Sequence, residues 1–270
     1  MTFIKNLKAS WDKKNSLVCV GLDTDLEKIP EHLKTHEKAA FEFNKTIIDA
    51  TVDFASSFKF QYAMYAGSDT IDQLKESINY VKQNYPDMPV ILDAKRNDIG
   101  NTAKMYAKQA FEILSADAVT VNPYMGGDTL EPFTDYKDKG VIVLCRTSNP
   151  GAKDLQDLEV EGKKIYQIVA EKVANEWNKN KNLLVVVGAT YPKELKEIRK
   201  IIGDMPILLP GIGAQGGDVK AVMDNGKDSN GQGLIVHSAR GIIYAGSDEK
   251  FAENAAEKAK KLRDEINKYR

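Results

Sequence analysis

Several features that mark particular classes of protein are scarce or missing in this 270-residue chain. It has only two cysteines, Cys19 and Cys145, each inside an apolar run and neither in a metal-type spacing such as Cys-x-x-Cys. We therefore expect reduced core residues instead of disulfides or zinc ligands. No run of about 18 consecutive apolar residues occurs, and the first residues contain no continuous apolar stretch. Neither a membrane span nor a signal peptide is predicted, and we expect a cytoplasmic protein.

The chain also lacks an excess of charge of either sign. Lys and Arg total 38 against 39 Asp and Glu, which gives a net charge of -1. This balance provides no general attraction to nucleic acid or to an anionic membrane, so we expect neither as a partner. An anionic ligand must then be held by local groups. Because 42% of the residues are hydrophobic, the chain can bury the core of one large globular domain.

What the sequence does contain is eight short apolar runs with helical patterns between them. Several runs are continuously apolar, as at 183–187, which is typical of strands covered on both faces in a parallel sheet. Eight β/α alternations in about 250 residues match the (β/α)8 or TIM barrel better than a doubly wound sheet. We predict one α/β domain over residues 1–270, with a loose polar turn at 224–231. The runs are 17–23, 57–61, 90–95, 118–124, 141–148, 183–189, 207–213 and 234–240, and the clearest helical patterns are 38–54, 69–85, 101–114, 163–177 and 251–269.

Polar side chains gather at the carboxyl ends of these runs, where a barrel enzyme has its active site. The most informative segment is 93–98, because Asp93 and Lys95 alternate on the third strand and Asp98 lies in the turn beyond it. Together with Lys59 at the end of the second strand, they form a network in which opposite charges keep each other ionised. This pattern suits the formation and protonation of a carbanion. It does not suit hydrolysis, since the chain has no Ser-His-Asp or Cys-His arrangement.

A second candidate site follows the seventh and eighth runs. The glycine-rich segment 210–217 includes Gly211 and Gly213, and Arg240 ends the eighth run. Loops in these positions often bind phosphate through backbone N–H groups, and Arg240 adds a bidentate cation. Asp23, at the end of the first run, has no third acidic neighbour that would make a metal site, so we interpret it as a contact to a substrate hydroxyl. His237 alternates with apolar residues and is predicted to be a core histidine.

These segments resemble the orotidine 5'-phosphate decarboxylase family. The matching pieces are 20–23, 58–61, 93–102, 147–151, 210–217 and Arg240, in order along the chain, and the Asp-x-Lys-x-x-Asp-Ile piece after a strand is highly specific. The segment 146–151 is similar to the longer-chain branch of that family. The resemblance implies a homodimer, without cofactor or metal, that converts orotidine 5'-phosphate to UMP and CO2 in de novo pyrimidine biosynthesis.

The resemblance also implies a role for each matching residue. Lys59, Asp93, Lys95 and Asp98 correspond to an alternating catalytic network in which Lys95 protonates C6 of the pyrimidine. The second aspartate and the following threonine of the motif serve the neighbouring subunit's site. The implied substrate-binding residues are Asp23 for the ribose hydroxyls, Ile99 and Thr102 for the partner's site, Thr147 or Ser148 for the pyrimidine edge, Gln215 for the phosphate and base, and Gly211, Gly213 and Arg240 for the phosphate.

Three alternatives remain open. Sugar-phosphate enzymes of the same suprafamily, such as 3-keto-gulonate 6-phosphate decarboxylase and hexulose-phosphate synthase, carry a similar motif but hold Mg²⁺ partly through an acidic residue where this chain has Lys59. A Schiff-base aldolase needs a neutral lysine, whereas a lysine flanked by aspartates stays protonated. A non-catalytic nucleotide-phosphate module would bind UMP without turnover, and it gives no reason for lysines to alternate with carboxylates.

Overall fold

Eight parallel strands close into a barrel in the computed structural model, which describes residues 1–212 and 218–270. The order around the barrel is β1-β10-β9-β8-β5-β4-β3-β2, and every neighbouring pair is parallel. The predicted TIM barrel is therefore confirmed. The strands are β1 (Val18–Leu22), β2 (Ser57–Gln61), β3 (Val90–Arg96), β4 (Ala118–Val121), β5 (Gly140–Arg146), β8 (Leu183–Val187), β9 (Ile207–Pro210) and β10 (Leu234–Ser238).

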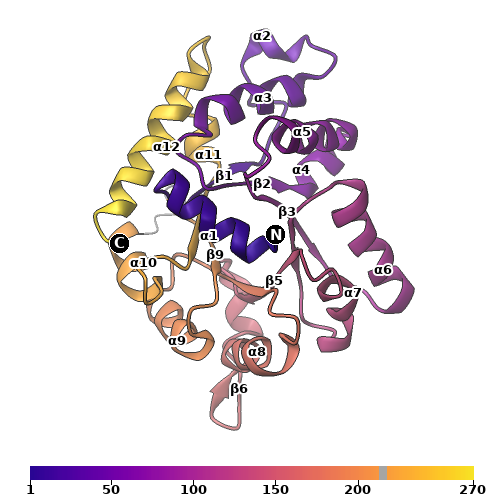
Figure 1. The fold of residues 1–270 in the computed structure, drawn as a ribbon, viewed down its shortest axis with the longest axis vertical. Coiled ribbons are helices and arrows are strands. Elements are labelled where there is room, and N and C mark those ends of the chain that lie inside the picture. The colour runs from indigo at the N-terminus through magenta and orange to yellow at the C-terminus, as the bar shows by residue number, and fades with distance from the viewer. Residues whose placement is uncertain (213–217) are drawn as a thin grey trace.

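Helices surround the barrel and cover the outer faces of the strands (Figure 1). The strands are therefore buried on both faces, as in β8, where all five residues are buried. Helix α12 packs its apolar stripe inward and follows the predicted terminal pattern. The helices are α2 (Glu31–Lys34), α3 (Ala39–Thr51), α4 (Tyr62–Gly67), α5 (Ile71–Asn84), α6 (Gly100–Lys108), α7 (Glu131–Thr134), α8 (Ile165–Lys172), α9 (Pro192–Ile202), α10 (Val219–Gly226), α11 (Arg240–Ile243) and α12 (Phe251–Asn267).

Helix α1 (Phe3–Lys14) was not among the predicted elements, and it lies across the amino end of the barrel (Figure 1). The backbone N–H of Phe3 donates to the carbonyl of Asp138, 2.7 Å away, just before β5. The hydroxyl of Ser10 donates to the carbonyl of Ser56 at 2.8 Å, just before β2. The apolar side chains of α1 are buried, namely Phe3, Leu7 and Trp11.

Strand β3 bulges at its carboxyl end. Leu92 is paired with Val119 of β4 and Arg96 with Val121, so β3 advances by four residues where β4 advances by two. Within the bulge, Lys95 has φ +46°, in the left-handed region that non-glycine residues seldom adopt. The alternation expected for residues 90–95 therefore stops before Lys95, whose side chain is placed by the bulge.

Several element ends differ from the sequence-based ranges. β4, β5 and β9 stop before the ends of the runs 118–124, 141–148 and 207–213, because periodicity marks an apolar run better than the end of its pairing. The polar stretch 224–231 is not a loose insertion. Its first part continues α10, and the carboxylate of buried Asp228 accepts the N–H groups of Asn230 and Gln232 at 2.9 and 2.8 Å.

The smaller elements lie between the main ones. π-Helical turns η1 (Gln109–Ile113) and η4 (Val173–Trp177) extend α6 and α8, which explains the long helical patterns at 101–114 and 163–177. Short 3-10 helices η2 (Gly127–Thr129) and η3 (Pro150–Asp154) and the antiparallel pair β6 (Glu159–Val160) and β7 (Lys163–Lys164) belong to loops. Within residues 1–212 and 218–270, no helix is long and apolar enough to cross a membrane.

Candidate active site

A cavity of about 500 Å³ opens at the carboxyl ends of the barrel strands. It gathers predicted residues that lie far apart along the chain, because parallel strands all end on the same side of the barrel. Asp98, Ile99 and Thr102 do not line it, and Gly213 and Gln215 lie outside the described residues. The predicted residues that do line it are Asp23, Lys59, Asp93, Lys95, Thr147, Ser148, Gly211 and Arg240.

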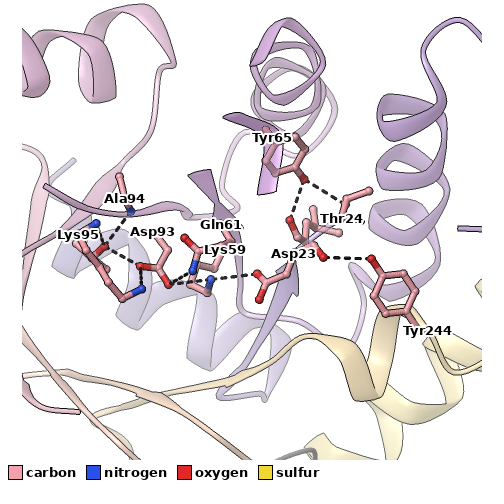
Figure 2. A network of polar contacts seen from close by, with 11 residues as sticks. Asp23, Thr24, Lys59, Gln61, Tyr65, Asp93, Ala94, Lys95 and Tyr244 are labelled. Atoms are coloured by element: carbon pink, nitrogen blue, oxygen red, sulfur yellow. Dashed lines mark hydrogen bonds and ion pairs between the residues drawn. The ribbon is translucent and has the colours of Figure 1, made fainter. Parts of the chain in front are cut away.

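Lys59 lies at the centre of the charged part of the cavity (Figure 2). Its Nζ atom is 3.2 Å from Oδ1 of Asp23 and 3.0 Å from Oδ2 of Asp93, and only 2% of its side chain is exposed. Burial by itself lowers the pKa of an ammonium, but Asp93 and Asp23 together hold the pKa of Lys59 above its usual value. Lys59 is therefore a fixed positive charge between two carboxylates.

Asp93 accepts four donors, two on each carboxylate oxygen. Oδ1 accepts Nζ of Lys95 at 2.7 Å and the hydroxyl of Thr120 at 2.8 Å. Oδ2 contacts Nζ of Lys59 at 3.0 Å and accepts Nε2 of Gln61 at 3.3 Å. Burial raises the pKa of the carboxyl, but the ammonium groups of Lys59 and Lys95 outweigh it and hold the pKa well below its usual value. Asp93 is thus ionised and fixed in orientation.

Lys95 connects this network to the open part of the cavity. Its side chain is 47% exposed, in contrast to Lys59, although its ammonium contacts Asp93 (Figure 2). The predicted contact between Asp93 and Lys95 is present, but it arises from the bulge and the left-handed backbone of Lys95. An ammonium held by one carboxylate and open to a ligand can donate a proton to it.

Asp23 follows β1 and is held in place through its backbone. Its carbonyl accepts the hydroxyl of Tyr244 at 3.1 Å (Figure 2). The same hydroxyl oxygen accepts the N–H of Asp25 at 2.7 Å. The carboxylate of Asp25 pairs with Lys28. In the part of the chain that the structure describes, no group of three or more His, Cys, Asp or Glu could hold a metal ion.

The loop after β5 is organised by Gln156, which the sequence analysis did not identify. Its Oε1 accepts the N–H of Thr147 at 2.9 Å, and its Nε2 donates to the hydroxyl of Thr147 at 2.9 Å. That hydroxyl in turn donates to Oδ1 of Asn149 at 2.7 Å. The hydrogen and one acceptor site of the Thr147 hydroxyl are therefore used within its own loop. Gln156 lies in an irregular polar stretch, where no periodic signal could have indicated it.

The opposite wall of the cavity is formed by β9 and β10. Gly211 has φ +107°, which only glycine adopts readily, and Arg240 begins α11 with an exposed side chain. His237 is 7% exposed, and burial, reinforced by the charge of Lys59, lowers its pKa to about 3. It packs against Gly21, where a Cβ atom would lie 2.2 Å from its Nε2. His237 is therefore buried and neutral, but the prediction of a satisfied core histidine is wrong: it lines the cavity, and its Nε2 atom has no hydrogen-bond partner among the described residues.

Asp98, Ile99 and Thr102 lie beyond β3, at the start of α6. Oδ1 of Asp98 accepts the N–H of Ile99 at 2.8 Å. Ile99 is 62% exposed, and Thr102 is also exposed. Ile99 and Thr102 face solvent in the single chain, Asp98 is partly buried, and none of the three lines the cavity of its own chain.

Both cysteines are buried and free, as predicted, and burial raises the pKa of each thiol to about 12. Thr120 is a further cavity residue that the sequence analysis did not identify. It is the one polar residue of β4, and a lone polar side chain in an apolar strand is the signal that could have indicated it.

Comparisons with known proteins agree with this geometry. The sequence model of the orotidine 5'-phosphate decarboxylase / HUMPS family matches residues 16–255. Proteins named orotidine 5'-phosphate decarboxylase are similar over the full chain: that of Dechloromonas aromatica is 54% identical, with all of both chains covered, and that of Janthinobacterium sp. is 52% identical, covering 100% of this chain and 99% of the relative. The solved structure of Leishmania donovani OMP decarboxylase has a TM-score of 0.85 at 37% identity, covering 100% of this chain and 98% of that one.

Proposed function

The chain belongs to the orotidine 5'-phosphate decarboxylase / HUMPS family and is a carboxy-lyase, and we propose that it converts orotidine 5'-phosphate to UMP and CO2 in the cavity at the carboxyl ends of its barrel strands. The observation that supports the proposal best is the buried chain of contacts from Asp23 through Lys59 and Asp93 to Lys95. It provides fixed charges at one end of a cavity of about 500 Å³. This volume suits a nucleotide-sized ligand.

We assign the phosphate, ribose and base of the substrate to different residues that line the cavity. The phosphate lies against Arg240 and the backbone near Gly211, and the ribose hydroxyls donate to the carboxylate of Asp23. The pyrimidine edge lies against Thr147 or Ser148, which both line the cavity after β5. The base then places its C6 carboxylate toward Asp93 and Lys95.

Decarboxylation breaks the bond between C6 and the carboxylate carbon and leaves the electron pair on C6. No adjacent carbonyl delocalises this carbanion in the ordinary way, so a nearby fixed positive charge must stabilise it. Lys95 supplies that charge, because its ammonium is held by Asp93 and is open to the cavity. A proton then passes from Nζ of Lys95 to C6, giving UMP, and the neutral amine regains a proton from solvent.

Asp93 contributes in a second way, through repulsion of the substrate. With a carboxylate-to-carboxylate distance of about 4 Å and an effective dielectric constant near 20, the repulsion is about 4 kcal/mol and is relieved as CO2 departs. Binding energy from the phosphate at Arg240 offsets this repulsion in the bound substrate. Arg240 thereby assists the reaction without touching the reacting carbon.

We further propose that two chains share their sites in a homodimer. In the single chain, Asp98, Ile99 and Thr102 stand outside the cavity, and two of them are clearly exposed. A second chain that covers this surface can receive Asp98 beside its own Lys95. In this arrangement Asp98 joins the charged network of the partner chain, whereas it stands outside the cavity of its own chain.

The reaction requires no metal in this proposal, because the ammonium of Lys59 occupies the position where the sugar-phosphate enzymes of the family carry an acidic metal ligand. A cation at this position repels Mg²⁺. The test is the loss of orotidine 5'-phosphate absorbance after adding purified protein in the presence of EDTA. Turnover in EDTA is expected. Activity that disappears in EDTA and returns with Mg²⁺ would favour a sugar-phosphate enzyme, and UMP binding without any turnover would favour a binding module.

A further inference from the structure

The bulge of β3 leaves two backbone N–H groups without a place in the ladder between β3 and β4. Pairing is regular up to Leu92 and Val119 and resumes at Arg96 and Val121, so residues 93–95 of β3 face Thr120 alone. Backbone N–H groups in a buried region need an acceptor. Those of Ala94 and Lys95 are in this position.

The hydroxyl of Thr120 accepts both of these N–H groups. Its Oγ1 atom is 3.0 Å from the nitrogen of Ala94 and 2.9 Å from that of Lys95, and it donates to Oδ1 of Asp93 at 2.8 Å. A hydroxyl has two acceptor sites and one hydrogen, so all of its hydrogen-bonding capacity is used. Because both lone pairs are taken by N–H groups, the hydrogen is left to point at the carboxylate.

From this geometry we propose that Thr120 is the positioning residue of the Asp93–Lys95 pair. One hydroxyl fixes the carboxylate of Asp93 and the left-handed backbone from which Lys95 extends, and it thereby sets where the Lys95 ammonium stands relative to the substrate. The inference rests on the proposed decarboxylation and adds to it a residue outside the charged network.

The surroundings of Thr120 favour this role over simple packing. The other residues of β4 are Ala118, Val119 and Val121, and Thr120 is 1% exposed. A valine has nearly the same shape and would complete an apolar strand, whereas a buried hydroxyl is unfavourable unless it is hydrogen-bonded. The polar side chain is therefore explained by its three hydrogen bonds.

Two reciprocal variants separate the hydroxyl from the methyl group. Thr120→Val keeps the shape and removes the three hydrogen bonds, and Thr120→Ser keeps the hydroxyl and removes the methyl. We expect Thr120→Val to lose about 100-fold in kcat, since a small displacement of a catalytic group has an effect of that size. Its affinity for UMP should be unchanged, because Thr120 does not contact the phosphate end. Thr120→Ser should retain most of the wild-type kcat.

The amide hydrogens of Ala94 and Lys95 provide a readout that does not depend on activity. Their exchange with solvent should be faster in Thr120→Val and unchanged in Thr120→Ser, as measured by NMR on folded protein. If Thr120→Val does not fold, Thr120→Ala and Thr120→Ser offer the same comparison, because they differ only by the hydroxyl.

The results distinguish the inference from the function on which it rests. A wild-type protein without turnover overturns the proposed function and the positioning role with it. An active wild type whose Thr120→Val variant has normal kcat, or a Thr120→Ser variant that is the more damaged of the two, overturns only the positioning role.

Discussion

Replacing Lys59 by methionine tests the charged centre of the site through protein stability. The Nζ atom lies 3.0 Å from Asp93 and 3.2 Å from Asp23, so each contact has a Coulomb energy of about 5 kcal/mol at an effective dielectric constant near 20. Part of this is offset by the desolvation of the buried ions, and removal of one partner from such a group typically costs about 3–5 kcal/mol. Asp93 keeps Lys95 as a partner and Asp23 is partly exposed, so we expect Lys59→Met to lose about 3 kcal/mol at neutral pH.

The loss should depend on pH in a defined direction. The pKa of Asp93 is lower in the folded state than in the unfolded chain, so its contribution is complete above the unfolded carboxyl pKa of about 4 and disappears as the pH falls through the folded pKa. The pKa of Lys59 is raised, so its contribution is complete at neutral pH and disappears only in strong alkali. The stability difference between wild type and Lys59→Met should therefore be largest near neutral pH and smaller below about pH 4.

Equilibrium unfolding in urea, followed by tryptophan fluorescence at neutral pH and near pH 3.5, measures this difference, with the lower pH chosen from the carboxyl pKa of about 4. Lys13→Met is the matched control, because Lys13 lies 2.9 Å from Asp87 but both side chains are exposed, at 65% and 76%. Its loss should be much smaller, because solvent screens the charges of an exposed pair. The reasoning is refuted if Lys59→Met is no more destabilising than Lys13→Met, or if its effect is the same in acid.

Three other outcomes can be checked separately. Lys95→Ala and Asp98→Ala should each be nearly inactive alone. Mixing the two variants with subunit exchange should restore about a quarter of wild-type activity, because random two-fold assembly makes half of the dimers mixed and each mixed dimer has one intact site. If activity does not recover although exchange is proven, the sites are not shared. Gly21→Ala should lower the free energy of unfolding by about 1–3 kcal/mol, since its Cβ would lie 2.2 Å from Nε2 of His237, and an unchanged urea midpoint contradicts this. Arg240→Ala should weaken UMP binding by about 2–5 kcal/mol in calorimetry, and an unchanged affinity would place the phosphate site elsewhere.

Much of the fold follows from patterns that are local in the sequence. The run at 57–61 predicts β2 to the residue, and the continuous apolar run at 183–187 gives β8, because burial on both faces leaves no ambiguity about a central parallel strand. Helix α1 could not be placed in this way. Its amphipathic pattern is compatible with any apolar surface, and only tertiary contacts before β2 and β5 put it at the amino end of the barrel.

The residues of the candidate site that lie at strand ends could be predicted from the sequence, whereas those that depend on strand register could not. Lys59 and Asp93 follow from the rule that polar residues at the carboxyl ends of barrel strands meet, and they lie 3.0 Å apart. The bulge at Lys95 and the hydrogen bonds of Thr120 did not follow, since both depend on the register between β3 and β4. Register is set by the packing of whole strands, and a single sequence does not state it.

The position of α1 also has a consequence for the order of events in a turnover. Because this helix covers the amino ends of the strands, the cavity exchanges its contents with solvent at the carboxyl ends, where Arg240 stands exposed. On the proposed function, we expect substrate to enter and product to leave at this end of the barrel. UMP must therefore depart before the next substrate molecule can bind, and it competes with that substrate for the same path as well as for the same contacts. Product release at the carboxyl ends of the strands is therefore a candidate for the rate-limiting step of turnover.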